Sequence, residues 1–403
     1  MLRRAGRSIR VAWLAIGAAL VLVLALESAY RGQAWLRQSI GAWRASKHLP
    51  SHMAAKTWYA QVIAEGLSAT SGWRPYVYYR RLPYKGRYVT VDSLGRRWTP
   101  QAAPEGAARE VLMFGGSPLW GTGLPDSMTI PARVAGELTG HGVRNAVVTN
   151  FGESGYVFTQ EVIELLLQLR AGARPAAVVF YDGYNDVSSA LENGYAGVTK
   201  TERDRPRDSD LGRALFPWRT DLATESRVAL ELGRIAVGRL RFVSRFRSEH
   251  PVSAPPNDSL ADEVVRTYVA TADEVEALAQ DYGFEVLYVW MPLLDPAEKH
   301  LSPFEHQVAD ATEHDPAGHR FLELHRLVTR RLAAAMHSAA PGRFIEISPM
   351  FAADSAAVYV DDLGHTTEVA AAAIGADLAQ LLTPMIAGAS RHSGRGAAAT
   401  RGR

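Results

Sequence analysis

A serine that follows two glycines is the residue of this sequence whose setting points most directly to chemistry. Ser117 comes after Gly115 and Gly116, which end a short apolar run over residues 111–114. The run predicts a buried strand, and the glycines allow a tight turn with amide N–H groups free to face a ligand. Open α/β folds bind their ligands at this carboxyl edge of the sheet. We interpret Ser117 as a candidate nucleophile, against the commoner alternative of an ordinary Gly-Ser turn.

A nucleophilic serine needs a base to take its proton and a third group to orient that base. Near the carboxyl end, Asp361-Asp362-Leu-Gly-His365 precedes a helical pattern over residues 366–382. His365 is the candidate base and Asp362 the candidate orienting carboxylate, which gives the chain order Ser, Asp, His. Together these three residues predict acyl transfer through a serine nucleophile.

Acyl transfer also requires hydrogen-bond donors for the oxyanion that develops in the transition state. Two further predicted strands, over residues 145–150 and 176–180, end in glycine-bearing loops that carry Gly152 and Asn185. The ends of adjacent parallel strands lie side by side. We therefore expect an oxyanion hole formed by the backbone N–H groups of Ser117 and Gly152 and the side-chain amide of Asn185.

These four blocks resemble those of the SGNH (GDSL-like) hydrolase family. In the family's order they read Gly-Gly-Ser117, Asn-Phe-Gly152, Gly-Tyr-Asn185-Asp and Asp362-Leu-Gly-His365, within about residues 110–385. The resemblance is closest to membrane-anchored members whose first block reads Gly-Gly-Ser. It implies a flavodoxin-like sheet and an esterase or lipase-type activity on acyl esters, without indicating the substrate. Gly116 stands where the family's name motif has an aspartate that is not one of its catalytic groups.

Alternating strand and helix patterns predict the fold that would position these groups. The expected strands cover residues 111–114, 145–150, 176–180, 284–290 and 344–347, and helical patterns cover 161–169, 260–280, 321–336 and 366–382. This alternation predicts an α/β fold, a three-layer α/β/α sandwich around a five-stranded parallel sheet. Aromatic and β-branched runs at 76–79 and 87–91 predict a small β-ribbon ahead of it.

The amino terminus predicts a membrane anchor. Four arginines at positions 3, 4, 7 and 10 precede an apolar run over residues 11–26. The run would extend about 24 Å as a helix, near the lower limit for crossing a bilayer. The arginines favour a cytoplasmic amino terminus and an exported remainder. Glu27 interrupts the small-residue pattern of a cleavage site, which favours an uncleaved signal-anchor over a signal peptide.

The predicted organisation follows from these segments. Residues 1–30 form the cytoplasmic arginines and the transmembrane signal-anchor, and residues 31–105 form a stalk helix and the β-ribbon. Residues 106–387 form the hydrolase-like domain, with an insertion or lid at 188–257. Residues 388–403 are rich in glycine, alanine and arginine, a composition that predicts a disordered tail.

Several other residues could be mistaken for, or could assist, a catalytic site. Ser154 lies in Gly-Glu-Ser-Gly-Tyr, which lacks the last glycine of a nucleophile elbow. Trp120, Tyr156 and Tyr184 fall near strand ends, where they would either stack on a sugar ring or pack in the core. Five histidines match no metal-binding motif and predict a solvated flap instead (His300, His306, His314, His319, His325).

Composition excludes other classes of function. The chain has no cysteine, which rules out disulfides and thiolate chemistry, and its net charge of +2 gives no indication of nucleic-acid binding. The glycine-rich segment 115–123 lacks the Gly-Lys-Ser/Thr of a phosphate-binding loop, so we expect no nucleotide, and neither a cofactor nor a metal is predicted. The sequence favours a membrane-anchored, extracytoplasmic serine esterase that deacylates a glycan. The alternatives are an O-acyltransferase of the same fold that modifies a polysaccharide, and a catalytically silent glycan-binding or assembly protein.

Overall fold

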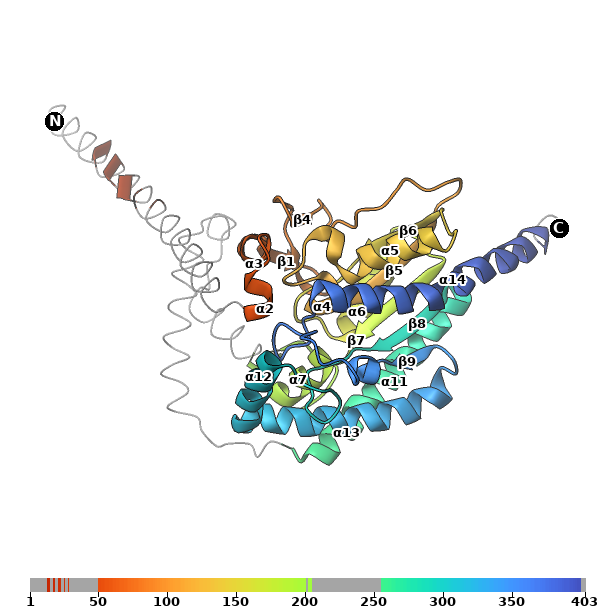
Figure 1. Ribbon diagram of the computed structural model, residues 1–403. Coiled ribbons are helices and arrows are strands. Elements are labelled where there is room, and N and C mark those ends of the chain that lie inside the picture. The colour runs from red at the N-terminus through yellow and green to blue at the C-terminus, as the bar shows by residue number, and fades with distance from the viewer. Residues whose placement is uncertain are drawn as a thin grey trace, which may run out of the picture. The chain divides into compact units, whose positions relative to one another are not determined.

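The fold is known from a computed structural model, which describes residues 50–200, 202–204 and 255–399 and a few separate helical positions between residues 13 and 28. Side chains are described as far as residue 387. Residues 45–202 and 254–403 form one compact unit, and the account below concerns that unit (Figure 1). The part of the expected stalk helix that precedes residue 50 and most of the apolar run at 11–26 lie outside the described residues.

A five-stranded parallel sheet forms the centre of the unit. Its strands are β5 (Arg109–Gly115), β6 (Ala146–Asn150), β7 (Ala177–Asp182), β8 (Glu285–Trp290) and β9 (Phe344–Glu346). They lie in the order β6-β5-β7-β8-β9, and every neighbouring pair is parallel. In chain order this is 2-1-3-4-5, the flavodoxin-like arrangement. All five predicted strands and the fold class are confirmed.

Helices cover both faces of the sheet and complete three layers. On one face, α5 (Ile130–Gly140) packs against α14 (Glu368–Ala399), and α14 also contacts β7 and β8. On the other face lie α6 (Phe158–Arg170) and α11 (Asn257–Tyr282), with α13 (Pro316–Ala339) and α7 (Tyr184–Asn193) beside them (Figure 1). The inner strands are the most buried, with β7 buried at every position and β8 at all but its first, which explains their continuous apolar runs. The edge strand β9 is half-buried throughout.

The carboxyl-terminal helix is longer than its predicted span. Within the described residues, one helical stretch, Glu368–Ala387, is long and apolar enough to cross a bilayer. However, Ile374, Leu378 and Leu382 are fully buried in the core, so this stretch forms part of the sandwich. The helix continues through Ala399, which differs from the disordered tail predicted from residue 388.

The predicted β-ribbon is present as two antiparallel pairs. β1 (Ser71–Arg74) pairs with β2 (Tyr78–Arg81), and β3 (Tyr84–Lys85) pairs with β4 (Thr90–Val91). Two helices precede the ribbon, α2 (Ser51–Ala54) and α3 (Tyr59–Ser68). The compact unit runs without a break across residue 105, so the boundary predicted there does not separate two bodies.

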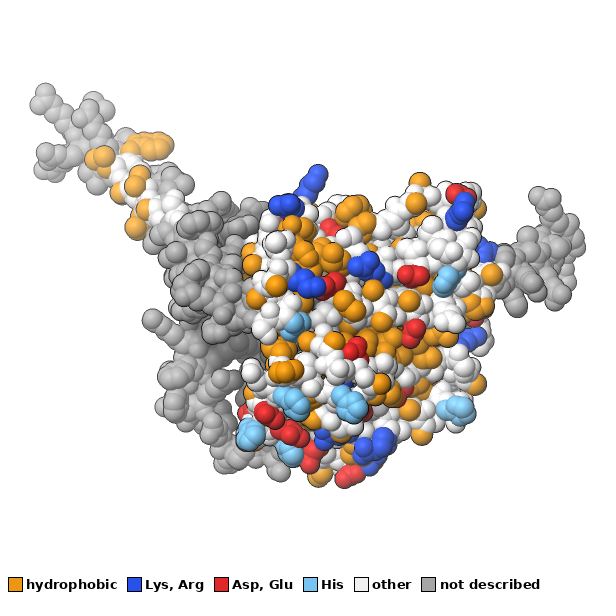
Figure 2. All heavy atoms as spheres, viewed as in Figure 1, with side chains coloured by type: hydrophobic (Ala, Val, Ile, Leu, Met, Phe, Trp, Pro, Cys, Tyr) orange, Lys and Arg blue, Asp and Glu red, His pale blue; other side chains and the backbone are white. Residues whose placement is uncertain are grey.

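The histidine-rich stretch is helical, so the prediction of a loop-like flap is wrong. Ser302 and Glu305 form a reciprocal capping box that starts α12 (Pro303–His314), and Asp315 caps the start of α13. Each helix also has proline at its first position, a combination that is typical of helix starts. Figure 2 shows histidine side chains gathered on the surface over α12.

Within the insertion expected at 188–257, α7 continues to Asn193, and a short 3-10 turn, η2 (Glu202–Asp204), follows it. Most of the insertion's remaining residues lie outside the described part of the chain. Two further 3-10 turns, η1 (Asp126–Met128) and η3 (Ser348–Phe351), lie in loops of the sandwich.

Candidate active site

The nucleophile turn forms where β5 ends. Ser117 is the first residue of the short helix α4 (Ser117–Trp120) and follows Gly116 directly. A Cβ atom on Gly116 would lie 2.3 Å from Nδ2 of Asn185, and one on Gly115 would lie 2.8 Å from the carbonyl oxygen of Tyr181. The glycines are therefore required by close approach of neighbouring groups. Ser117 itself is half-buried, at the carboxyl edge of the sheet as predicted.

The carboxyl-terminal loop brings a histidine to this serine. Nε2 of His365 lies 2.8 Å from Oγ of Ser117, and Nδ1 of His365 lies 2.6 Å from Oδ2 of Asp361. A carboxylate only accepts hydrogen bonds, so Nδ1 carries the imidazole proton and Nε2 is left to accept from the serine hydroxyl. The side chain of His365 is buried at 5% exposure. These contacts form a serine, histidine and aspartate relay with the geometry that nucleophilic catalysis requires.

The aspartate in this relay is Asp361, and the prediction of Asp362 as the orienting group is wrong in this structure. Asp362 is exposed, and its Oδ2 accepts a hydrogen bond from Oγ1 of Thr312 on α12 at 3.2 Å. Asp361 folds the loop on itself instead, because its Oδ1 accepts from the N–H of Leu363 at 3.0 Å and of His365 at 3.3 Å.

The loop geometry explains why Asp361, and not its neighbour Asp362, reaches the imidazole. Gly364 has φ +82°, and this left-handed residue turns the chain so that the side chain four positions before His365 reaches its ring. The sequence carries one signal of this turn, which is the aspartate itself. Aspartate is typical of turns in which the carboxylate accepts from the N–H two residues on, as Asp361 does from Leu363.

Asn185 lies where the oxyanion hole was predicted. It follows β7 as the second residue of α7, and its amide nitrogen lies against the Gly116 backbone beside Ser117. Among the described residues its side-chain amide has no hydrogen-bond partner, so the donor is free for a ligand. The N–H of Ser117, at the first position of α4, is the second donor that this turn offers.

Gly152, the third predicted donor, has its N–H engaged. It donates to Oδ1 of Asn150 at 2.8 Å. Asn150 is fully buried, and its Nδ2 donates in turn to the carbonyl oxygens of Leu119 at 3.1 Å and Trp120 at 3.4 Å. Sequence reasoning missed Asn150, which ties the nucleophile helix to the loop after β6. Its signals in the sequence are its place at a strand end and its position as the first residue of the block Asn-Phe-Gly152.

Two of the three aromatic residues proposed to stack on a sugar are inaccessible. Trp120 is 2% exposed, and the guanidinium groups of Arg81 and Arg97 each lie 4.3 Å from its ring. Tyr156 is 1% exposed and its hydroxyl donates to the carbonyl oxygen of Tyr79. Burial of both rings contradicts a stacking role and favours packing, the alternative considered for them.

Tyr184 remains on the active-site side. It is half-buried, packs at 4.9 Å between ring centroids against Phe321, and lies near both aspartates of the His365 loop. Burial, with smaller contributions from Asp362 and Asp361, raises the pKa of Tyr184 to about 12. Its hydroxyl is therefore neutral at physiological pH and available as a hydrogen-bond donor near the catalytic loop.

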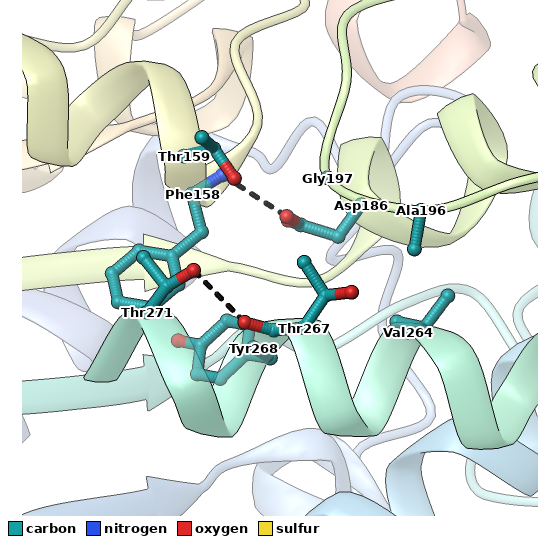
Figure 3. A pocket seen from close by; sticks show the side chains of 9 residues that line it. All are labelled: Phe158, Thr159, Asp186, Ala196, Gly197, Val264, Thr267, Tyr268 and Thr271. Atoms are coloured by element: carbon teal, nitrogen blue, oxygen red, sulfur yellow. Dashed lines mark hydrogen bonds between the residues drawn. The ribbon is translucent and has the colours of Figure 1, made fainter. Parts of the chain in front are cut away.

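A cluster of buried carboxyl groups lies beneath the oxyanion side of the site. Burial raises the pKa of Glu161 and of Asp182 well above their usual ranges, and raises that of Asp186 to about 6. The hydroxyl of Tyr268 donates to Asp182 at 2.9 Å, and the N–H of Phe158 donates to Asp186 at 3.0 Å. Figure 3 shows Asp186 at a small cavity between α6, α7 and α11.

The remaining candidates of the sequence have structural roles. Oγ of Ser154 accepts from Nη2 of Arg81 at 2.7 Å, so its partner is not a histidine. His325 is fully buried, its ring lies 5.8 Å from that of Trp290, and burial lowers its pKa to about 4. Across the described part of the chain, no three histidine, aspartate or glutamate side chains are placed to hold a metal ion.

No family model matches this chain, and a comparison with curated proteins also finds no match. Among solved structures, the chain is similar to a proposed arylesterase from Agrobacterium tumefaciens, with 18% identity over 69% of this chain and 99% of the other and a TM-score of 0.40. It is likewise similar to a carbohydrate acetylesterase family member from Sinorhizobium meliloti (16% identity, 69% and 99% coverage, TM-score 0.36). A third similar structure is a lipolytic protein of the G-D-S-L family from Veillonella parvula (12% identity, 66% and 94% coverage, TM-score 0.35).

Proposed function

We propose that this protein is a carboxylic ester hydrolase of the SGNH (GDSL-like) type, with Ser117 as nucleophile and His365 as general base. One observation carries the proposal. Oγ of Ser117, the imidazole of His365 and the carboxylate of Asp361 form a continuous line of hydrogen bonds of 2.8 and 2.6 Å. They come from two segments 248 residues apart, and the other two blocks of the family, at Gly152 and Asn185, border the same turn.

The geometry supports a two-step acyl transfer to water. As Oγ of Ser117 attacks the ester carbonyl carbon, its proton passes to Nε2 of His365, and the resulting imidazolium is stabilised by Asp361. The carbonyl oxygen, now negatively charged, is held by the amide of Asn185 and the N–H of Ser117. Collapse of this intermediate expels the alcohol, which takes the proton from His365. Water then attacks the acyl-serine with His365 again as base, and the acid is released.

The location and the substrate class belong to the same proposal. The arginines at positions 3–10 and the apolar run at 11–26 support a single-pass anchor with the catalytic unit outside the cytoplasm. Esters available to a tethered enzyme on that side of the membrane include those of acylated surface glycans, and we take an acylated polysaccharide as the substrate. The half-buried Tyr184 is the aromatic residue that remains to line its path.

The test uses the full chain and a matched pair of serine variants. Ser117→Ala should abolish hydrolysis of a short-chain aryl ester and labelling by a fluorophosphonate, because both reactions need the nucleophilic oxygen. Ser154→Ala is the control, since that hydroxyl lies in a similar glycine-rich loop but bonds Arg81. Full activity in Ser117→Ala, or loss of labelling only in Ser154→Ala, would refute the assignment. An export-dependent reporter fused near Ala387 tests the topology.

A further inference from the structure

We propose that helices α2 and α3, the N-terminal strap of residues 51–68, belong to the catalytic machinery, and that Tyr59 is the positioning residue that holds the His365 loop against the nucleophile turn. The inference rests on the catalytic roles proposed above for Ser117 and His365. It gives this segment a different role from the one predicted from the sequence, which is a stalk outside the hydrolase domain.

The strap packs directly on the acid–base loop. Met53 and Tyr59 are buried at 0% and 3% exposure in a small apolar cluster with Val360, which is 9% exposed. Val360 immediately precedes Asp361, and its N–H donates to the carbonyl oxygen of His365 at 3.0 Å. The cluster therefore packs against Val360, whose hydrogen bond to His365 joins the two ends of the loop. This loop carries both the base and its orienting carboxylate.

The same helix packs on the nucleophile side. A Cβ atom on Gly123, in the loop after α4, would lie 3.4 Å from the ring of Tyr59, and one on Gly66 would lie 3.9 Å from the ring of Trp120. Val62 of α3 also shares an apolar cluster with Trp120, the last residue of α4. One face of α3 thus touches the elements that carry both partners of the hydrogen bond between Ser117 and His365.

Polar contacts fix the strap in this position. Nζ of Lys56 pairs with the carboxylate of Glu368, the first residue of α14, three positions after His365. The carboxylate of Glu65 accepts from the N–H groups of Tyr88 at 2.8 Å and Val89 at 2.9 Å in the β-ribbon. The segment between α2 and α3 is thus tied to α14, and the last turn of α3 is tied to the β-ribbon.

This arrangement has a kinetic consequence. The nucleophile and the base sit on separate segments, and their 2.8 Å contact depends on how those segments are packed. Misplacement of a catalytic group by about 1 Å can cost about 10²-fold in rate. The ring of Tyr59 lies between Val360, next to the His365 loop, and Gly123, in the loop after α4. Loss of the ring would therefore allow these two segments to move relative to each other.

The experiment compares variants of the full chain. Tyr59→Ala should lower kcat about 10–100-fold with little change in KM, whereas Tyr59→Phe, which keeps the ring, should stay within about 3-fold of wild type. Phe284→Ala is the matched control. Phe284 is a buried aromatic residue at 4% exposure, directly before β8 and hence at the opposite edge of the sheet. Val360→Ala removes the partner of Tyr59 in the same contact and leaves a smaller cavity, so it should also lower kcat.

Hydrogen exchange provides a readout that does not depend on activity. The N–H groups of Val360 and Thr367 donate to His365 and Val358 across the loop, and their exchange should accelerate at least 10-fold in Tyr59→Ala but not in Phe284→Ala. Equal kcat losses in these two variants, or unchanged exchange of the loop in Tyr59→Ala and Val360→Ala, would overturn the strap proposal. A wild-type chain that neither hydrolyses esters nor labels would refute the proposed function, while the exchange comparison would still decide the role of the strap.

Discussion

Exchange of the two neighbouring aspartates for asparagine provides the sharpest test of the relay. Asp361→Asn keeps an oxygen at Oδ1, which accepts the loop N–H groups of Leu363 and His365. It places an amide NH₂ where Oδ2 now accepts from Nδ1 of His365. Nδ1 must then accept, the proton moves to Nε2, and the ring cannot take the proton of Ser117. Asp362→Asn leaves that contact unchanged.

The structure sets the size of the expected loss. A unit charge 2.6 Å from the imidazolium, with an effective dielectric constant of about 40–80 for a carboxylate one-third exposed, stabilises it by about 1.6–3.2 kcal/mol. That corresponds to about 10–200-fold in rate. Because the wrong tautomer adds to this loss, we expect kcat/KM of Asp361→Asn to fall about 10³–10⁴-fold in total. Asp362 is exposed, and its hydrogen bond among the described residues is with Thr312 and not with His365, so Asp362→Asn should stay within about 3-fold.

The assay measures two quantities for each variant: the pH-independent kcat/KM for an aryl acetate and the rate of labelling by a fluorophosphonate. Both should fall in Asp361→Asn, because both measure transfer of the serine proton to His365. The melting temperature of each variant provides the control for folding. A larger loss in Asp362→Asn than in Asp361→Asn would refute the reasoning and restore the aspartate that the sequence pattern favoured.

Three further predictions follow from individual contacts. Asn185→Ala removes one oxyanion donor and should lower kcat about 10²–10³-fold while labelling of Ser117 persists. Gly116→Ala places a methyl group 2.3 Å from Nδ2 of Asn185 and should impair kcat with a smaller effect on the melting temperature. The pKa of Asp186 is raised to about 6, against an ordinary value of 3.8, so the folded state binds this proton more tightly than the unfolded state does. Protonation of Asp186 therefore stabilises the fold fully below pH about 4, and this stabilisation is lost as the pH rises to about 6. Asp186→Asn should therefore make the free energy of unfolding fall less steeply over that window than it does in wild type. The measurement is the difference between the two proteins by urea unfolding, because the lowered pKa of His325 acts in the opposite direction in both.

The fold could be predicted from the sequence because its signal is strong and local. Each strand of a doubly covered parallel sheet is a continuous apolar run, and residues 176–180 and 284–290 mark β7 and β8 to within two residues at either end. The helices between them show apolar periodicity. The flap prediction for the histidine-rich stretch failed at α12, where Glu305 and Ala309 are the buried residues and apolar periodicity is therefore weak. The capping residues Ser302 and Asp315 are the clearer signal of the two helices there.

The candidate site could be predicted only to the level of the loop. Ser117, His365 and Asn185 were found because each follows directly from a strand end or from a family block. The choice between Asp361 and Asp362 depends on how the loop turns at Gly364, whose φ is +82°. The spacing of the two aspartates from His365 does not reveal which carboxylate reaches the ring, and turn-forming aspartate is a signal that both positions share. Likewise, Trp120 is covered by the guanidinium groups of Arg81 and Arg97, and no local pattern predicts that these two distant arginines lie beside it.

The residues that were not predicted share one property. Each contacts elements that are distant from it in the sequence. Asn150 bridges β6 to the carbonyl groups of α4, and Tyr59 bridges α3 to both catalytic segments. A strand-and-loop pattern identifies groups that chemistry requires, because nucleophile, base and donor must be particular residue types. It does not identify the groups that set distances between them, because many side chains of the right volume could fill those positions. In a site built from distant segments, the distances between catalytic groups are therefore set by residues that only the packed structure reveals. Substitution of these residues should lower kcat while every catalytic residue is still present.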